Sequence, residues 1–234
     1  MDVTQPVHKL TRQDLERLPA RRVRLGPSYK ADLFVYRVGG EDVFVKDYGG
    51  KRGIWRSVLG PFFVAREARA LRALTGVPGV PQLRCRPDRY CVAMAYIPGR
   101  RVRKTDPAVQ GNEAFVRDLA RIVRDLHARG VVHLDLKHRS NLMVGADELP
   151  VVLDFESAVV LDPRWPGSRL IVNALGRLDW LAVHNWTRRL CPHMLAGSRS
   201  DVRKARLARR LRGRWLPRRV IDAFLNILTR RGQG

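Results

Sequence analysis

Two aspartates follow short apolar runs, so each is expected at the end of a strand. Asp135 comes shortly after the pair Val131-Val132, and Asp154 directly follows Val151-Val152-Leu153. Two carboxylates presented together repel each other unless a cation or a proton lies between them. Phosphoryl transfer provides a cation: one carboxylate orients or deprotonates an acceptor hydroxyl, while the other, with an amide oxygen, holds Mg²⁺ on nucleotide phosphates. We therefore predict that Asp135 is catalytic and that Asp154 binds the metal.

Asn141 and Lys137 fit the same chemistry. Asn141 opens the run Asn141-Leu142-Met143-Val144 and is the predicted amide ligand of the metal. Lys137 follows Asp135 by two residues and is predicted to be a catalytic residue that reaches the transferred phosphate. An aspartate after a strand is also a common turn or capping residue. The assignment therefore depends on the whole set of residues and not on one of them.

A lysine and a glutamate upstream extend the pattern. Val43-Phe44-Val45 is an apolar strand that ends directly before Lys46, a position suited to pairing with nucleotide phosphates. A buried lysine needs a carboxylate beside it, and Glu67 on the following helix is the candidate. Glu67 also has arginines at helical spacing, with which it would form surface ion pairs that contribute little.

The first part of the chain is predicted to be rich in strands. β-Branched and aromatic runs separated by glycine-containing turns predict an antiparallel meander of three strands, with two more strands further along. These runs are Arg22–Leu25, Leu33–Val38, Val43–Lys46, Gln82–Cys85 and Tyr90–Ile97. Gly49–Gly60 is predicted to be a basic, glycine-rich linker, and Phe62–Leu74 a helix with one apolar face. Thr11–Leu18 suits a short polar helix.

Beyond Pro98 the chain is predicted to be mainly helical. Apolar residues at helical spacing predict helices at Ala114–Arg129, Ala174–Leu190, Val202–Arg214 and Arg218–Arg230. Short strands are predicted at Val131–His133, Asn141–Val144 and Val151–Phe155. The predicted fold class is α+β, with a small antiparallel β-rich lobe at residues 1–97 and a mainly helical lobe at residues 98–234.

The order of these motifs resembles that of the protein-kinase-like superfamily. A strand lysine and a helix glutamate precede the loop His133-Leu134-Asp135-Leu136-Lys137, and an asparagine and Asp154-Phe155 follow it. An Asp-Phe pair alone is weak, whereas five elements in the correct order are specific. The resemblance covers roughly residues 21–190 and implies a bilobal kinase-like fold that uses ATP and Mg²⁺. It also implies that Asp179, in Gly176–Trp180, braces the loop.

Several departures indicate the small, atypical bacterial branch of this superfamily. That branch includes the lipopolysaccharide core (Kdo) kinases and is related to the RIO-type kinases. The loop Leu25–Asp32 has one glycine instead of three, and its Ser28 and Lys30 resemble those of RIO-type nucleotide loops. Glu156 follows Asp154-Phe155 where a glycine is usual, and no Ala-Pro-Glu motif follows. Five residues, 136–140, separate the loop aspartate from the asparagine, against four in ordinary protein kinases.

The resemblance also implies a set of nucleotide-binding residues. Lys46 and Glu67 belong to this set, together with Ser28 and Lys30 of the loop. Met94 and Tyr96 either flank the adenine beside the hinge between the lobes or are plain strand residues.

The charge of the chain predicts an anionic partner. The formal net charge is +23 and the isoelectric point is near 11.4, which indicates either such a partner or a solvated arginine-rich surface. The arginine-dense tail Arg199–Arg219 is either a basic amphipathic helix on an anionic membrane or a last helix packed on the larger lobe. No secretory signal and no membrane-spanning run is evident. We expect a cytoplasmic protein with peripheral contact to the inner membrane.

These observations support three hypotheses about function. The first is an ATP- and Mg²⁺-dependent kinase that phosphorylates a sugar hydroxyl of the lipopolysaccharide core, without a nucleic-acid partner. The second is a RIO-like serine/threonine protein kinase. The third is a pseudokinase that acts as a binding module, which the single-glycine loop and the extra residue after Asp135 favour and the intact Lys46, Asp135 and Asp154 oppose.

Overall fold

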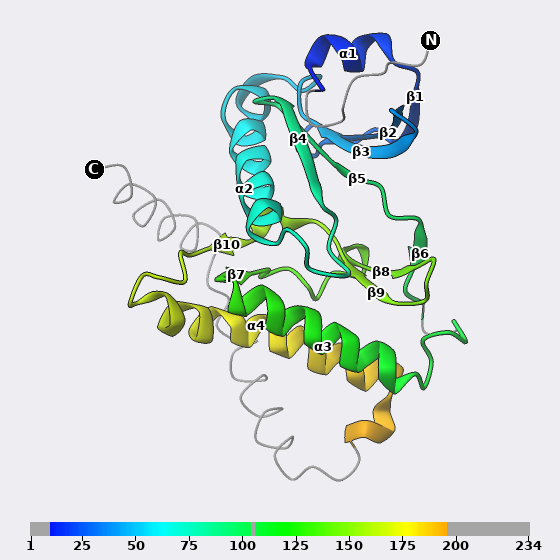
Figure 1. The fold of residues 1–234 in the computed structure, drawn as a ribbon, viewed down its shortest axis with the longest axis vertical. Coiled ribbons are helices and arrows are strands. Elements are labelled where there is room, and N and C mark those ends of the chain that lie inside the picture. The colour runs from blue at the N-terminus through cyan, green and yellow to red at the C-terminus, as the bar shows by residue number, and fades with distance from the viewer. Residues whose placement is uncertain (1–9, 104–105, 196–234) are drawn as a thin grey trace. The chain divides into compact units, whose positions relative to one another are not determined.

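The structure is a computed structural model that describes residues 10–103 and 106–195 (Figure 1). Its main sheet is antiparallel and has the strand order β1-β2-β3-β5-β4. The strands are β1 (Ala20–Arg24), β2 (Asp32–Val38), β3 (Glu41–Asp47), β4 (Leu83–Asp88) and β5 (Cys91–Ala95). The predicted meander and the two later strands are thus confirmed, and the α+β fold class with them.

Alternation along β3 and β5 separates the core from the pocket face of the sheet. Val43 and Val45 of β3, with Cys91 and Ala93 of β5, lie in a buried cluster with Leu15 of α1 (Arg12–Arg17) and with Leu10 and Leu18, which flank that helix. Successive side chains of a strand point to opposite faces. Phe44, Lys46 and Met94, which come between those core residues, therefore point away from α1 and line a pocket.

The short helix α1 is held to this sheet by charge as well as by apolar contact. Thr11 caps its first turn by accepting a hydrogen bond from the Asp14 backbone N–H, and the Asp14 carboxylate accepts one in return. Arg12 donates two hydrogen bonds to Asp47, at 2.6 and 2.9 Å, and one to Asp88 at 2.7 Å. These contacts fix α1 over the face of the sheet that the pocket does not use.

The region between β3 and β4 differs from the predicted linker. A π-helical turn, η2 (Trp55–Leu59), leads directly into α2 (Gly60–Ala73), so the helix starts before the predicted Phe62. The reason is close packing: a Cβ placed on Gly60 would lie 2.6 Å from the Cβ of Tyr48. Gly60 therefore serves the approach of helix to sheet rather than the flexibility of a linker.

The second part of the described chain contains two long helices and two small sheets. α3 (Glu113–Ala128) and α4 (Ser168–Leu190) lie side by side (Figure 1). One sheet has the order β6-β8-β9, and in the other β7 pairs with β10. Their bounds are β6 (Gly99–Arg101), β7 (Val131–Val132), β8 (Leu142–Gly145), β9 (Pro150–Val152) and β10 (Val159–Val160). Three 3₁₀ turns complete the order: η3 (Arg139–Asn141), η4 (Phe155–Ser157) and η5 (Pro192–Leu195).

Some predicted boundaries in this part are corrected. α4 begins at Ser168 rather than at Ala174, because its first turns expose Leu170 and hide the apolar pattern. The predicted strand Val151–Phe155 ends at Val152, since Asp154 adopts a left-handed φ of 66° and Phe155 starts a 3₁₀ turn. β6 and β10 have no counterpart among the predicted strands.

The described residues up to Pro192 belong to one compact unit, and His193–Leu195 belong to a second. The division into lobes at residues 97 and 98 stays a prediction. The two predicted tail helices and the basic tail Arg199–Arg219 lie outside the described residues. Within the described part of the chain, no helix has the length and apolar character needed to span a membrane.

Candidate active site

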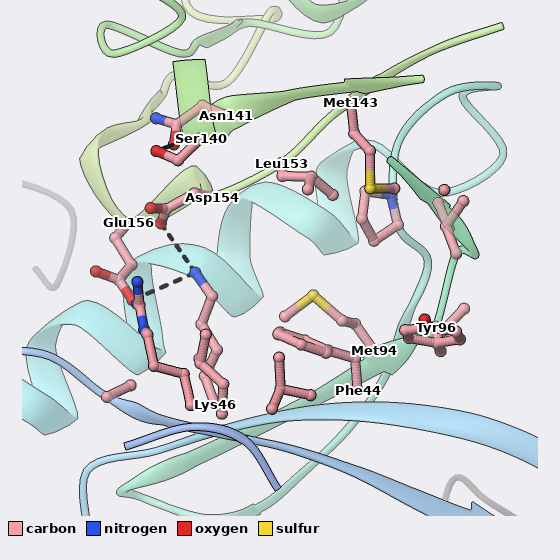
Figure 2. Close-up of a pocket in the computed structure, with 18 of the residues that line it drawn as sticks. Phe44, Lys46, Met94, Tyr96, Ser140, Asn141, Met143, Leu153, Asp154 and Glu156 are labelled. Carbon is pink, nitrogen blue, oxygen red and sulfur yellow. Dashed lines mark hydrogen bonds and ion pairs between the residues drawn. The ribbon is translucent and has the colours of Figure 1, made fainter. Parts of the chain in front are cut away.

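A pocket of about 330 Å³ lies between the main sheet and the strands β8 and β9. Apolar side chains from both sides form its walls: Leu33, Phe44 and Met94 from the main sheet, and Met143 and Leu153 from the opposite side. Polar groups gather at one end and Tyr96 lies at the other (Figure 2). The pocket therefore combines an apolar slot with a charged end, as suits a ligand that has an apolar ring and an anionic group.

Four charged side chains at the polar end form what we name the lysine cluster: Lys46, Glu67, Asp154 and Glu156. Lys46 Nζ donates hydrogen bonds to Glu67 Oε1 and Asp154 Oδ1, each at 2.8 Å, and to Glu156 Oε1 at 3.3 Å. Figure 2 shows Lys46 rising from the sheet toward Asp154 and Glu156. Because the Lys46 and Glu67 side chains are only 9% and 1% exposed, water screens their pairing weakly.

The close packing of these charges alters their pKa values. Burial, with the charges of Glu156 and Asp154, raises the pKa of Glu67 to about 7, although Lys46 opposes the shift. Burial acts to lower the pKa of Lys46, but the three carboxylates outweigh it and hold that pKa well above its ordinary value. Burial also opposes ionisation of Asp154, yet Lys46 lowers the pKa of this carboxyl overall. Lys46 and Asp154 are therefore charged at neutral pH, and Glu67 titrates there.

Helix α2 and the segment after Asp154 are joined by hydrogen bonds. The Phe155 backbone N–H donates to Glu67 Oε1 at 3.3 Å, and Arg66 Nη2 donates to the carbonyls of Ser157 and Ala158 at 2.9 and 3.1 Å. The position of α2 thus fixes where Asp154 is presented. The left-handed backbone of Asp154 is a strained conformation for a residue that is not glycine, and such strain concentrates at functional sites.

The segment 133–141, here named the Asp135 loop, brings Asp135 and Asn141 together. Asn141 Nδ2 donates to the Asp135 carbonyl at 3.0 Å and to Asp135 Oδ2 at 3.1 Å, while Asn141 Oδ1 accepts from Ser140 Oγ at 2.9 Å. The extra residue in the loop is absorbed by two successive turns, in which His138 N donates to Asp135 O and Asn141 N to His138 O. Asn141 therefore keeps its place beside Asp135 despite the longer spacing.

The buried Asp179 holds the start of this loop through hydrogen bonds to its backbone. The backbone N–H groups of His133 and Leu134 each donate to the Asp179 carboxylate at 2.8 Å, and His127 Nε2 lies 3.0 Å from the same group. Leu134 has a positive φ of 65°, so the two bonds stabilise a strained turn. This geometry confirms the predicted bracing by Asp179.

His133 links the loop to the segment that carries Asp154. The imidazole is fully buried, with Nε2 3.0 Å from the Leu153 carbonyl and the ring 4.8 Å from the ring of Phe155. It has no exposed face from which to exchange a proton with a ligand. His133 is a structural member of the loop.

The donor set at the polar end fits Mg²⁺ bound together with phosphates. Asp154 Oδ and the Asn141 amide oxygen are oxygen ligands of the kind that Mg²⁺ prefers, and both residues line the pocket. Among the described residues, no group of three His, Cys, Asp or Glu side chains is placed to hold a metal ion alone. Further ligands would have to come from the bound molecule or from water, as is usual for Mg²⁺. Glu67 Oε2 is buried and has no hydrogen-bond partner, which is a further sign of a site built around charge.

The loop between β1 and β2 is closed by a second buried lysine. Lys51 Nζ donates to the Gly26 carbonyl at 2.9 Å and to Asp32 Oδ1 at 2.7 Å, and Gly26 N donates to the same carboxylate oxygen at 2.9 Å. Lys30 of this loop lines the pocket. Ser28 is exposed and lies outside the pocket wall.

Most of the predicted site residues meet in this one place. The pocket wall includes Lys30, Lys46, Met94, Tyr96, Asn141 and Asp154. Glu67 contacts Lys46 from α2, and Asp135 contacts Asn141 from the loop. Lys137 is exposed and, among the described residues, makes no hydrogen bond or ion pair. Ser28 and Lys137 are thus the two predicted residues that the structure leaves apart from the others, and the roles of all ten stay predictions.

Glu156, Tyr48 and Lys51 make polar contacts in or beside the site that were not predicted. Tyr48 Oη donates to Glu156 Oε2 at 3.2 Å, so both belong to the polar end of the pocket. For Glu156 the sequence contained a signal, because a carboxylate two residues after Asp154 stands where glycine is usual. For Tyr48 and Lys51 it contained none, since each reaches its partner only through the tertiary fold.

The comparisons with known proteins find the fold and no family. Neither protein-family models nor curated protein sequences give a match. Among solved structures, the Rio2 kinase of Chaetomium thermophilum in an ADP/Mg²⁺-phosphoaspartate complex matches with a TM-score of 0.53 and 16% identity. The match covers 76% of this chain and 57% of that one. The chain has a protein-kinase-like fold.

A second crystal structure of the same Rio2 kinase matches with a TM-score of 0.53, 15% identity and coverage of 76% and 60%. In this fold the sheet lysine Lys46 pairs with the α2 glutamate Glu67, while Asn141 of the Asp135 loop lines the same pocket as Lys46. The chain spans less than two thirds of the length of the Rio2 kinase chains that it matches.

Proposed function

We propose that this protein is an ATP- and Mg²⁺-dependent phosphotransferase with an alcohol group as acceptor. One observation carries the proposal: Lys46 is bonded to both Glu67 and Asp154 at 2.8 Å at the end of a pocket that Asn141 also lines. Asp135 lies within hydrogen-bond distance of that asparagine, at 3.1 Å. Phosphoryl transfer depends on positioning and on charge stabilisation, and the arrangement of these residues supports both.

Each residue has a distinct task in this proposal. Lys46 binds nucleotide phosphate through its ammonium group, and Glu67 keeps that group in place. Asp154 and the Asn141 amide would hold Mg²⁺, which when bound neutralises charge on the phosphates. Asp135, whose side chain is 30% exposed, orients the acceptor hydroxyl and accepts its proton. The apolar walls at Phe44 and Met94 accommodate the base.

For the acceptor we propose an anionic molecule, with a sugar hydroxyl of the lipopolysaccharide core as the first choice. Lys137, His138 and Arg139 are exposed in the Asp135 loop, and His138 Nε2 lies 3.7 Å from Asp135 Oδ1. An acceptor that carries phosphate or carboxylate groups would be attracted to the Lys137 and Arg139 cations, and the net charge of +23 favours its approach. The proposed location is the cytoplasm, with peripheral contact to the anionic inner membrane.

A protein acceptor is the alternative that the experiment must separate. The matched Rio2 kinase was crystallised as an ADP/Mg²⁺-phosphoaspartate complex, a property of that protein. In the test, the purified full chain receives radiolabelled ATP and Mg²⁺ with either core lipopolysaccharide or a protein extract. Label on the lipopolysaccharide, absent with an Asp135→Asn variant, is the expected result. Label on protein alone would replace the proposed acceptor, and nucleotide binding without any transfer would favour a binding module.

A further inference from the structure

Lys46 has every donor occupied in the lysine cluster. A lysine ammonium carries three N–H donors, and in this structure three carboxylates accept from it: Glu67, Asp154 and Glu156. A nucleotide phosphate can therefore bind Lys46 only if one of these contacts breaks.

The contact to Glu156 is the one best suited to break. At 3.3 Å it is the longest of the three, and the Glu156 side chain is 24% exposed in the pocket wall. Glu67, by contrast, is only 1% exposed and also accepts from the Phe155 backbone, so it cannot leave without moving the chain. Asp154 pairs with Lys46 at 2.8 Å and is needed for the metal.

Tyr48 keeps the Glu156 carboxylate within reach. Tyr48 Oη donates to Glu156 Oε2, while Lys46 donates to the other oxygen, Oε1. Glu156 can therefore give up Lys46 and remain bound to Tyr48, which is almost completely buried and fixed. The Glu156 carboxylate thus has two hydrogen-bond donors, Lys46 and the Tyr48 hydroxyl, and it keeps the Tyr48 bond when the Lys46 bond breaks.

The charge of the cluster decides in which form the nucleotide can enter. Even with Glu67 protonated, Asp154 and Glu156 outnumber Lys46 by one negative charge. At Lys46 itself this excess repels the phosphates of a free polyphosphate, while Arg24, Lys30 and Arg101, which line the same pocket, attract them. A divalent cation reverses the balance, because it neutralises carboxylates and phosphates together.

We propose that Glu156 is a positioning residue that takes the place of a phosphate on Lys46, and that it restricts nucleotide binding to the magnesium complex. The inference rests on the proposed function, since it concerns the same nucleotide. It goes beyond that function because it gives the glutamate after Asp154-Phe155 a task of its own.

Equilibrium binding of ATP to the purified full chain tests this inference, with Mg²⁺ present in one series and EDTA in the other. Glu156→Gln keeps the shape of the side chain and removes its charge. We expect this variant to bind metal-free ATP about tenfold more tightly than the unmodified protein, with a much smaller change for the magnesium complex. Glu156→Asp should restore part of the discrimination, and Tyr48→Phe should act in the same direction as Glu156→Gln but by a smaller factor.

Glu16→Gln provides the matched control, because Glu16 is exposed on α1, on the face of the sheet opposite the pocket. It removes the same charge and should leave both affinities unchanged. An equal ratio of affinities with and without Mg²⁺ in Glu156→Gln and in the unmodified protein would overturn the inference while leaving the proposed function intact. Absence of ATP binding in every series would overturn both.

Discussion

The two halves of the candidate site are built in opposite ways. In the lysine cluster every charge has a bonded partner, and the Lys46 and Glu67 side chains are withdrawn from water. In the Asp135 loop, the backbone is held firmly by Asp179, but the cations Lys137 and Arg139 are exposed and make no ion pair with described residues. The difference suggests that the nucleotide end is assembled before binding, whereas the acceptor end takes its counter-charges from the acceptor.

The largest effects should come from the two aspartates, one in each half. Asp154→Ala and Asp135→Asn should each lower the rate of phosphotransfer by about 10²–10⁴-fold. Only Asp154→Ala should also weaken binding of the magnesium nucleotide, since Asp135 is proposed to orient the acceptor hydroxyl and not to bind the nucleotide. Rates from label transfer and affinities from calorimetry separate the two. Equal losses of affinity in both variants would contradict the division of the site into two halves.

Replacing Asp179 should remove the hydrogen bonds that hold the start of the Asp135 loop. Asp179→Ala leaves the buried N–H groups of His133 and Leu134 without an acceptor. Each unsatisfied group costs about 1–3 kcal/mol, so the free energy of unfolding should fall by about 2–6 kcal/mol. Denaturant titration measures the loss. As a control, Asp118→Ala removes the exposed Asp118–Arg121 pair and should cost less than about 1 kcal/mol; similar losses in both variants would show that Asp179 does not brace the loop.

The dependence of the unfolding free energy on pH is a test of the buried state of Glu67 in the lysine cluster. The folded pKa of Glu67 is raised to about 7 from 4.5, so the folded state holds the proton more tightly than the unfolded state does. The stability that the folded state gains from this tighter-held proton is complete below about pH 4.5, and it is lost as the pH rises through about 7. Relative to a Glu67→Gln variant, the unmodified protein should therefore lose stability between pH 5 and 8, on the order of a few kcal/mol. Parallel melting curves at all pH values would contradict the buried, crowded state of Glu67.

The smallest effects are expected at the exposed cations of the Asp135 loop. Lys137→Ala and Arg139→Ala should raise the KM for an anionic acceptor by about three- to tenfold and weaken its dependence on salt. Affinity for ATP should stay the same, and stability should change by less than about 0.5 kcal/mol. Steady-state kinetics at two ionic strengths would reveal this. A higher KM for ATP instead would place Lys137 at the nucleotide.

The sequence predicted the parts of the fold that periodicity determines. The apolar run Val43-Phe44-Val45 placed Lys46 at the end of a strand, and the order of motifs anticipated its partner Glu67. The π-helical turn before α2 was missed, because Gly60 suggested flexibility where close packing on Tyr48 requires a glycine. Glu156 was recognised only as a missing glycine, since the direction of its side chain depends on the left-handed backbone at Asp154. Features of this kind depend on contacts between segments that are distant in the sequence, and a local sequence pattern does not contain those contacts.

The tie between Lys51, Gly26 and Asp32 has a consequence for how often the protein can turn over. Glycine-rich loops commonly lift and close in each catalytic cycle, but this loop has a buried ion pair across its base. Opening the loop would separate these two charges and break the hydrogen bond from Gly26 N to Asp32 at the same time. Open states of the loop should therefore be rare, and amide hydrogens such as that of Gly26 should exchange slowly with solvent. Departure of the spent nucleotide, rather than the chemical step, would then set the pace of the cycle.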